Sequence, residues 1–158
     1  MNDIKRYVLD SSAFINANMI PEGELFSTPI IKDELKDFKS KMLFQTRDVM
    51  TMSPENKFIS QIKSKALGTG DLTRLSEQDI SVLALAKQID ATLLTDDYSM
   101  QNIAEDMGIK YNSVSVPKIT KVLKRAPYCD KCYRYRAGEK CPKCGGKLRL
   151  KINKKEEI

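Results

Sequence analysis

The stretch RYVLDSSAFI, residues 6–15, contains the pattern that decides the fold. A short apolar run at residues 6–9 predicts a strand, Asp10 ends it, and the apolar residues after two serines predict a helix. The segment 91–95 repeats this order, because a second strand is followed by two aspartates and another helix. Strands that alternate with helices favour an α/β fold with a parallel sheet, in which ligands bind beyond the carboxyl ends of the strands.

Further segments extend this alternation. Thr28-Pro29 predicts the start of a helix, and apolar residues at helical spacing continue it over 31–42. Another helix is expected to begin after Ser76, and the strand at 91–95 and its helix are followed by a last strand over 109–116. The segment 44–73 carries mixed signals and predicts no element.

The chain has 158 residues and no histidine, and this absence excludes several classes of enzyme. Ser-His-Asp and Cys-His nucleophiles, HExxH zinc hydrolases and the histidine pairs that cleave RNA without metal all need an imidazole. Any catalysis must use carboxylates, lysines, hydroxyls, thiolates or bound metal ions. No apolar run approaches the ~20 residues that cross a bilayer, so we expect a soluble, cytoplasmic protein without a membrane partner.

Several carboxylates occupy positions where an acid is costly. On helical wheels Glu34 and Asp79 lie among apolar neighbours, while Asp10 and the pair Asp96-Asp97 follow the two strands. No pattern of nearby lysines neutralises them. Grouped carboxylates are ligands for Mg²⁺ or Mn²⁺, and such an ion orients and activates the water that hydrolyses a phosphodiester. These acids therefore predict a metal-dependent nuclease site.

Each acid also has a purely structural explanation. Asp79 lies three residues after Ser76 and is equally explained as the acidic half of a capping box. Asp10 could belong to the turn after its strand, and the aspartates after the second strand could cap the next helix. Glu34 could extend from the edge of the apolar stripe into solvent. The occurrence of all these acids in one chain without histidine favours the metal site.

Charge divides the chain into two regions. Residues 1–117 have 13 basic and 17 acidic side chains, a net charge of −4, whereas residues 118–158 have 14 basic and 4 acidic ones, a net charge of +10. We expect four parts, which are a nuclease domain at 1–117, a basic linker or short helix at 118–127, a zinc ribbon at 128–152 and a charged tail at 153–158.

The four cysteines have the spacing Cys129-x2-Cys132-x8-Cys141-x2-Cys144. Each Cys-x2-Cys turn points two thiolates at one centre, and four thiolates form the closed shell of a structural zinc ion. A redox dithiol would need one pair beside a βαβ pattern, and iron is the less common occupant of a ribbon of this size. A zinc ion held in this way has no open position and is expected to be structural.

The region around the cysteines is basic and aromatic, which is typical of nucleic-acid binding. Lysine and arginine bind phosphates, and tyrosine stacks on unpaired bases. The alternative for the tyrosines is that they cover the small core of the ribbon. The candidate RNA-binding residues are Lys121, Lys124, Arg125, Tyr133, Arg134, Arg136, Lys143 and Lys147.

These motifs carry a family resemblance. Residues 7–14, the helix of Glu34, residues 75–86 and residues 94–98 resemble the four acidic motifs of PIN-domain ribonucleases. Asp71, Asp96 and the run SMQN at 99–102, followed by a four-cysteine ribbon, are similar more narrowly to the Nin-one-binding (Nob-type) endonucleases of small-subunit ribosome maturation, in their compact archaeal form.

The resemblance implies a PIN-like parallel sheet flanked by helices, dependence on Mn²⁺ or Mg²⁺, and cleavage of precursor 16S-type rRNA at its 3′ end on the small ribosomal subunit. It implies Asp10, Glu34, Asp79 and Asp97 as the catalytic acids, assisted by Asp96, with Asp10, Asp79 and Asp97 as the ligands of the catalytic metal. Two alternatives stay open, a toxin-type PIN ribonuclease acting on other RNA and a non-catalytic rRNA-binding assembly factor.

Overall fold

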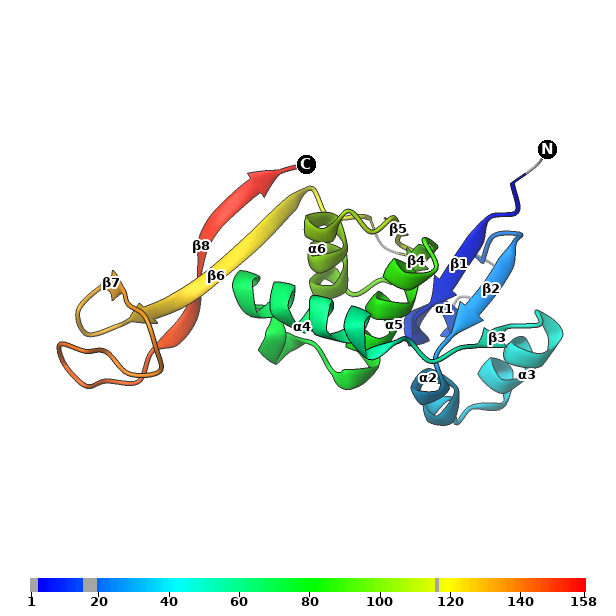
Figure 1. Ribbon diagram of the computed structural model, residues 1–158, viewed down its shortest axis with the longest axis horizontal. Coiled ribbons are helices and arrows are strands. Elements are labelled where there is room, and N and C mark those ends of the chain that lie inside the picture. Colours follow the sequence, from blue (N-terminus) through cyan, green and yellow to red (C-terminus); the bar gives the residue numbers. More distant parts are fainter. Residues whose placement is uncertain (1–2, 16–19, 116) are drawn as a thin grey trace.

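The computed structural model describes residues 3–15, 20–115 and 117–158, and its body is built on one parallel sheet (Figure 1). The five strands lie in the order β3-β2-β1-β4-β5, so that β1 and β4 pair at the centre. The strands are β1 (Arg6–Leu9), β2 (Glu24–Ser27), β3 (Met50–Thr51), β4 (Thr92–Leu94) and β5 (Tyr111–Asn112). The expected strands at 6–9 and 91–95 are confirmed. The last expected strand shortens to β5, and its expected end, Val116, lies outside the described residues.

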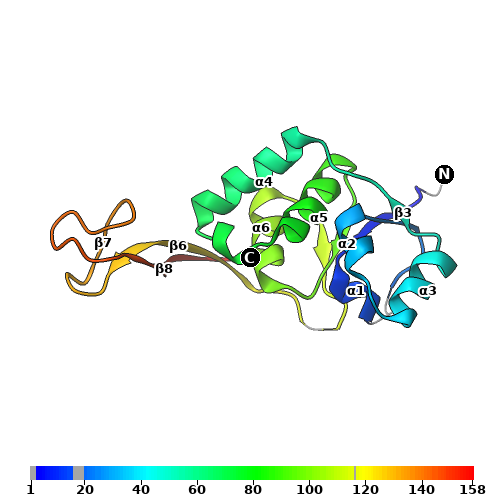
Figure 2. The same ribbon diagram turned by 90° about the horizontal axis from the view of Figure 1, so that it is seen from below.

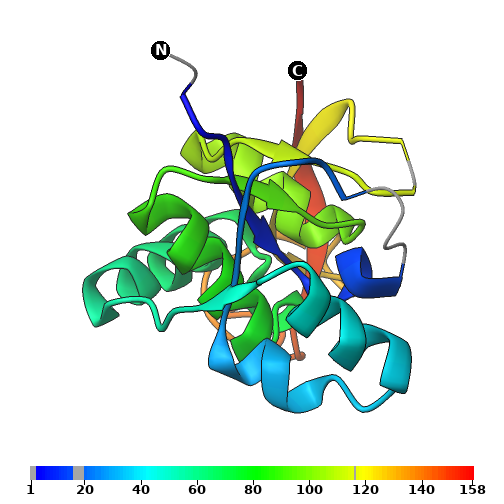
Figure 3. The same ribbon diagram turned by 90° about the vertical axis from the view of Figure 1, so that its right-hand side faces the viewer.

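Helices cover both faces of this sheet, with α4 and α5 on one side and α1 and α3 on the other (Figure 3). The expected α/β fold with a parallel sheet is therefore confirmed. The helices are α1 (Ser11–Ile15), α2 (Pro29–Glu34), α3 (Phe38–Thr46), α4 (Asn56–Thr69), α5 (Glu77–Gln88) and α6 (Tyr98–Met107), with a 3₁₀ turn η2 (Leu72–Arg74) before α5. No helix in the described part of the chain is long and apolar enough to cross a membrane.

The helix expected over 29–42 is two helices. It starts as predicted, with Thr28 as N-cap and proline first, but α2 ends at Glu34 because Leu35 is extended. Asp37 then caps α3 by accepting a hydrogen bond from the backbone N–H of Ser40 (2.9 Å). Ile31 and Leu35 of the expected apolar stripe stay buried, but the break turns its second half outward, and Phe38 is 74% exposed.

Strands β2 and β3 and helix α4 were missed by the sequence patterns. Strand β3 has only two residues, both exposed, and is too short to show an alternation of apolar and polar residues. Helix α4 has 14 residues, but only Ile62 and Ala66 among its apolar side chains are buried. Its sparse stripe explains why the segment 44–73 gave mixed signals.

The C-terminal region forms an arm that projects from the body (Figures 1 and 2). Its antiparallel sheet has the order β7-β6-β8, from β6 (Lys121–Cys129), β7 (Arg134–Tyr135) and β8 (Arg149–Glu157). Strands β6 and β8 pair from Lys121 opposite Glu157 to Tyr128 opposite Arg149. Residues 121–127, expected in a linker or short helix, are therefore a strand, and most of the expected charged tail at 153–158 pairs with it.

A buried ion pair joins this arm to the body. Asp71, which is fully buried, accepts a hydrogen bond from Nη1 of Arg125 on β6 (2.7 Å). The same carboxylate accepts from the Thr69 hydroxyl and from Nδ2 of Asn102, both at 2.8 Å. Polar groups from the end of α4, from α6 and from β6 thus satisfy one another, as buried charges require.

Helix α6 adds backbone contacts to the same junction. The Asn102 side chain donates to the carbonyl oxygen of Leu123 (2.8 Å) and accepts from its N–H (2.6 Å), as a neighbouring strand would. Gln101 accepts from the N–H of Ile119 (3.0 Å) and donates to the carbonyl oxygen of Thr95 (3.0 Å). The start of the arm is therefore held against α6 and, through Thr95, against the end of β4.

Gly70 provides a test of this junction, because it has a φ of +78° and its Cα faces β6. A Cβ there would lie 2.7 Å from Cβ of Arg125 and 2.8 Å from its carbonyl oxygen. We predict that Gly70→Ala lowers the free energy of unfolding by more than ~1 kcal/mol, measured by urea titration. Gly68→Ala is the matched control, since nothing lies within 4 Å and the residue is helical, so it should be neutral or stabilising. Equal effects of the two changes would contradict the docking described above.

Candidate active site

The ends of β1 and β4 are tied together by side chains. Asp10 directly follows β1, and its carboxylate, only 4% exposed, accepts a hydrogen bond from the Thr95 hydroxyl (2.8 Å) and a longer one from the Ser12 hydroxyl (3.4 Å). The Thr95 hydroxyl accepts in turn from the N–H of Asp97 (3.0 Å), and the Ser12 hydroxyl accepts from the N–H of Asp96 (3.1 Å). The ends of β1 and β4, which the sequence predicted to lie at one edge of the sheet, are thus joined by hydrogen bonds.

Burial raises the pKa of Asp10 to about 6. Hydrogen bonds from Thr95 and the backbone of Ser11 oppose this rise, while the negative charges of Asp79 and Asp97 add to it. These two carboxylates therefore lie close enough to Asp10 to repel it. A buried acid beside two like charges is the electrostatic setting of a site for a cation.

Asp79 and Asp97 also perform the structural roles that sequence reasoning left open for them. Asp79 closes a capping box, since one of its oxygens, Oδ2, accepts from the N–H of Ser76 (2.9 Å) while its own N–H donates to the Ser76 hydroxyl (3.2 Å). Asp97 caps α6, and its Oδ1 accepts from the N–H groups of Ser99 (2.8 Å) and Met100 (3.3 Å). Each cap holds the carboxylate in one orientation through one oxygen, and within the described part of the chain the other oxygen accepts no hydrogen bond.

Asp96 is directed elsewhere. Its carboxylate accepts from the N–H of Val114 (2.7 Å) and from the N–H (3.0 Å) and hydroxyl (2.6 Å) of Ser115, in the loop after β5. The negative charge of the adjacent Asp97 contributes to the raised pKa of Asp10. Asp96 fixes the neighbouring loop.

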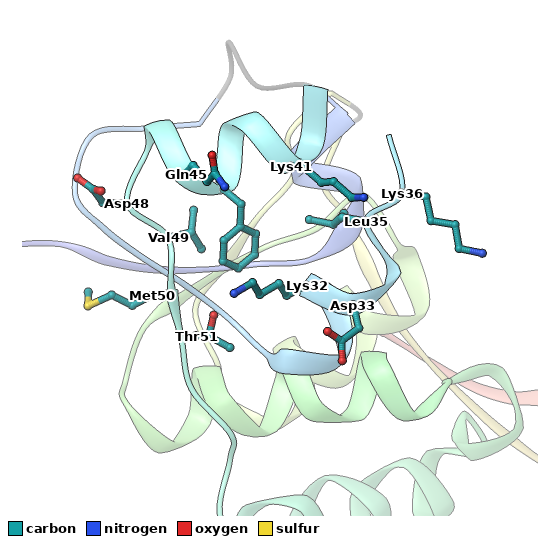
Figure 4. A pocket seen from close by; sticks show the side chains of 11 residues that line it. Lys32, Asp33, Leu35, Lys36, Lys41, Gln45, Asp48, Val49, Met50 and Thr51 are labelled. Atoms are coloured by element: carbon teal, nitrogen blue, oxygen red, sulfur yellow. The ribbon is translucent and has the colours of Figure 1, made fainter. Parts of the chain in front are cut away.

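Glu34 differs from the expectation, because it is exposed at the end of α2 and not among buried apolar neighbours. The hydroxyls of Thr28, the N-cap of α2, and Ser81 on α5 share a hydrogen bond (3.1 Å), which holds α2 against the helix that begins near Asp79. Lysines line a cavity beside α2, although Glu34 itself does not line it. A cavity of about 850 Å³ between α2, α3 and β3 is lined by Lys32, Lys36 and Lys41 (Figure 4).

The four cysteines converge at the far end of the arm, where their Sγ atoms all lie within 4.8 Å of one another. The Sγ atoms of Cys129 and Cys144 are 3.5 Å apart, and those of Cys132 and Cys141 are 3.9 Å apart. Tetrahedral ligands at ~2.3 Å from a zinc ion are ~3.8 Å apart, so this donor set fits a metal ion. In residues 3–15, 20–115 and 117–158 no carboxylate group is as tightly clustered.

Comparisons with known proteins agree with this geometry. A model of the PIN domain of ribonuclease matches residues 7–89, and a model of the PINc domain ribonuclease matches residues 56–126. Endoribonuclease Nob1 of Pyrococcus abyssi is 37% identical over 92% of both chains, and Endoribonuclease Nob1 of Methanocaldococcus jannaschii is 33% identical over 96% of this chain and 80% of its own.

The chain belongs to the PIN-domain ribonucleases and, within them, to the Nob1 endoribonucleases. It is an RNA-cleaving hydrolase of a metal-dependent class. Ribonuclease VapC1 of Thermoplasma acidophilum is also similar, 32% identical over 96% of this chain and 81% of its own. VapBC-1 from nontypeable Haemophilus influenzae matches 70% of this chain with a TM-score of 0.50 and 14% identity, which supports the PIN fold alone.

The arm of this Nob1 relative places the candidate RNA-binding residues in two settings. At its base, Lys121, Lys124 and Arg125 are paired with Glu157 (3.4 Å), Glu156 (3.3 Å) and Asp71 (2.7 Å) respectively. Near the cysteines, Tyr133 is 77% exposed at a positive φ, and Arg134, Lys143 and Lys147 are also exposed while Arg136 is partly buried. Unpaired positive charge is therefore concentrated at the tip.

Sequence reasoning missed the junction that connects the PIN domain to its arm. The sequence singled out Asp71 and the run 99–102 only through the family resemblance. In the structure these residues hold β6. A polar residue that ends a helical segment, such as Asp71 after α4, carries no local sign of its partner. Only Arg125, 54 positions later, completes its environment.

The raised pKa of Asp10 gives a prediction about stability. Its folded value of about 6 exceeds the ordinary value of 3.8, so the native state loses stability as pH rises from about 4 to about 6 and regains none above it. Without added divalent ions, Asp10→Asn should raise the free energy of unfolding by ~2–3 kcal/mol at pH 7.5, and the gain should vanish near pH 4. Urea titrations at both pH values measure this.

Asp90→Asn is the control for this prediction, because Asp90 is exposed at the opposite edge of the sheet, before β4. Its effect on stability should be small and nearly independent of pH. An Asp10→Asn protein that is no more stable than the parent at pH 7.5 would contradict the account of a buried, unneutralised carboxylate.

Proposed function

We propose that this endoribonuclease matures the small ribosomal subunit in the cytoplasm by cutting precursor 16S-type rRNA at its 3′ end. The observation that carries the proposal is the match to Endoribonuclease Nob1 of Pyrococcus abyssi over 92% of both chains, which spans the PIN domain and the cysteine arm together. A second candidate is a toxin-type ribonuclease acting on other RNA, and the similarity to Ribonuclease VapC1 favours it.

The carboxylates Asp10, Asp79 and Asp97 are the proposed ligands of a catalytic Mg²⁺ or Mn²⁺ ion, and Glu34, at the end of α2, is the fourth proposed catalytic acid. Carboxylate oxygens are the donors that both ions prefer, and a cation among them would offset the burial and, to a lesser extent, the like charges that raise the pKa of Asp10. When bound, such an ion lowers the pKa of a water molecule and neutralises charge on the scissile phosphate.

The protein's own contribution is to hold these acids still. The Thr95 hydroxyl fixes Asp10, and the helix caps fix Asp79 and Asp97 through one oxygen each, which leaves the other oxygen for a ligand. Preorganised ligands lose little conformational freedom when they bind. Asp96 is proposed to assist by holding the loop at 114–115, not as a ligand.

The arm is proposed to bind RNA and to carry zinc on Cys129, Cys132, Cys141 and Cys144. The exposed tip residues Tyr133, Arg134, Lys143 and Lys147 supply phosphate contacts and a stacking surface. This division of labour is needed because the PIN domain itself carries a net negative charge, which repels RNA.

A cleavage experiment tests the proposed function. The protein is incubated with a precursor rRNA fragment that spans the mature 3′ end, with and without Mn²⁺, and the product ends are mapped. We expect one Mn²⁺-dependent cut at the mature end. Asp10→Asn should lower the rate at least ~100-fold while RNA affinity stays within about twofold, because the change removes a proposed metal ligand but no RNA contact.

Asp90→Asn again serves as the control and should leave both cleavage and affinity unchanged. Cuts scattered over the precursor, or efficient cleavage of unrelated tRNA or mRNA, would favour the toxin-type alternative. Full activity of Asp10→Asn would refute the assignment of the active site, and RNA binding without any cleavage would favour the assembly factor.

A separate prediction concerns the cysteine cluster. Cys141→Ser should reduce bound zinc below one equivalent and weaken RNA affinity about tenfold, because the turns that present Arg134 and Lys143 lose their support. Metal analysis and RNA titration measure the two effects. The Asp10→Asn protein should retain one zinc ion. If Cys141→Ser kept full RNA affinity after losing zinc, the arm's tip would not be the RNA anchor.

A further inference from the structure

A groove of about 310 Å³ lies where the arm meets the PIN domain. Tyr98 and Ser99 border it directly after Asp97, Arg74 borders it just before the capping box of Asp79, and Lys121 borders it at the start of β6. The groove therefore begins beside two of the site's carboxylates and ends on the arm. None of the roles assigned above uses it.

The side chains on its rim are free to bind a ligand. Tyr98 is 52% exposed, although its ring is large and apolar. The Arg74 guanidinium is exposed and pairs with no carboxylate in the described part of the chain. Lys121 has only an exposed ion pair with Glu157, and such pairs contribute little.

The polar groups on the floor of the groove already have hydrogen-bond partners. Asp71 is neutralised by Arg125, and Asn102 is saturated by the backbone of Leu123. These groups neither repel an anion nor compete for the rim cations. The groove thus combines an aromatic face with two cations and no free acid, which is the combination that binds a nucleotide by base stacking and phosphate contact.

We propose that this groove is a subsite for one unpaired nucleotide of the RNA substrate, adjacent to the scissile phosphate. The base stacks on Tyr98, and Arg74 and Lys121 bind the phosphates on either side. The volume is at the lower end of the ~300–1,000 Å³ range of small-molecule sites, so it admits a single splayed nucleotide and excludes a duplex. The proposal rests on the function proposed above and predicts that the enzyme selects single-stranded RNA.

Binding is tested with the uncut complex. In the Asp10→Asn protein, a short single-stranded RNA is titrated with 2-aminopurine placed at each position in turn, and its fluorescence reports stacking. One position should be quenched, Tyr98→Ala should abolish that quenching, and Tyr98→Phe should restore it. Quenching at no position, or quenching that survives Tyr98→Ala, overturns the subsite.

Cleavage provides the second readout. Tyr98→Ala and Arg74→Ala should each lower kcat/KM about tenfold, while the loss for Tyr98→Ala should disappear when the substrate is abasic at the quenched position. Phe38→Ala and Lys63→Ala are matched controls, since Phe38 is an exposed aromatic on α3 and Lys63 an exposed cation on α4, and both should leave kcat/KM unchanged. Equal losses on the intact and abasic RNA would show a structural effect and overturn the proposal.

The two proposals fail in distinguishable ways. Cleavage at the rRNA 3′ end that is insensitive to Tyr98→Ala would refute the proposed subsite and support the proposed function. Quenching at one position of a single strand, without a cut in precursor rRNA, would support the subsite and remove the rRNA assignment. Free AMP at equal concentration should not displace the RNA, and if it did, the groove would be a mononucleotide site instead.

Discussion

The hydrogen bond from the Thr95 hydroxyl to the Asp10 carboxylate joins the ends of the two central strands. The Asp10 carboxylate is buried at this edge of the sheet, where water cannot solvate its charge. Repulsion from Asp79 and Asp97 adds to the free-energy cost of ionising it. A fold that served stability alone would have an apolar or neutral residue here. Protonation relieves this cost at low pH, and the cation proposed for this site would relieve it at neutral pH.

At this edge the carboxylates that cap two helices are also the proposed metal ligands. Because a cap occupies one carboxylate oxygen, it determines the direction in which the other oxygen points. The capping box of Asp79 therefore does not exclude its proposed role as a metal ligand. Short-range rules of helix formation build the cap, and the parallel sheet brings the capped helices together, so that the site follows from local chemistry and topology.

The parts predicted from sequence are those with local signatures. The apolar runs before Asp10 and Asp96, the N-caps at Thr28 and Ser76, and the cysteine spacing each depend on residues within a segment of at most 16 positions. The break after Glu34 was missed because Phe38 and Met42 mimic a continuing stripe, although Asp37 caps a new helix. Strand β6 was missed because its lysines and arginines suggested a linker, whereas pairing with β8 from the far end of the chain makes it a strand.

The arm shows why such a distant contact matters for function. Net charges of −4 and +10 attract one another, so a flexible tether would let the basic region fold onto the acidic site and occupy it. The pairs of Arg125 with Asp71 and of Lys124 with Glu156 neutralise the base of the arm, and Asn102 anchors its backbone. The candidate RNA-binding residues Arg134, Lys143 and Lys147, which form no ion pair within the described part of the chain, lie at the tip, away from the carboxylates. In the proposed function, RNA bound at the tip crosses the junction to reach Asp10, and the proposed subsite at Tyr98 lies at that junction.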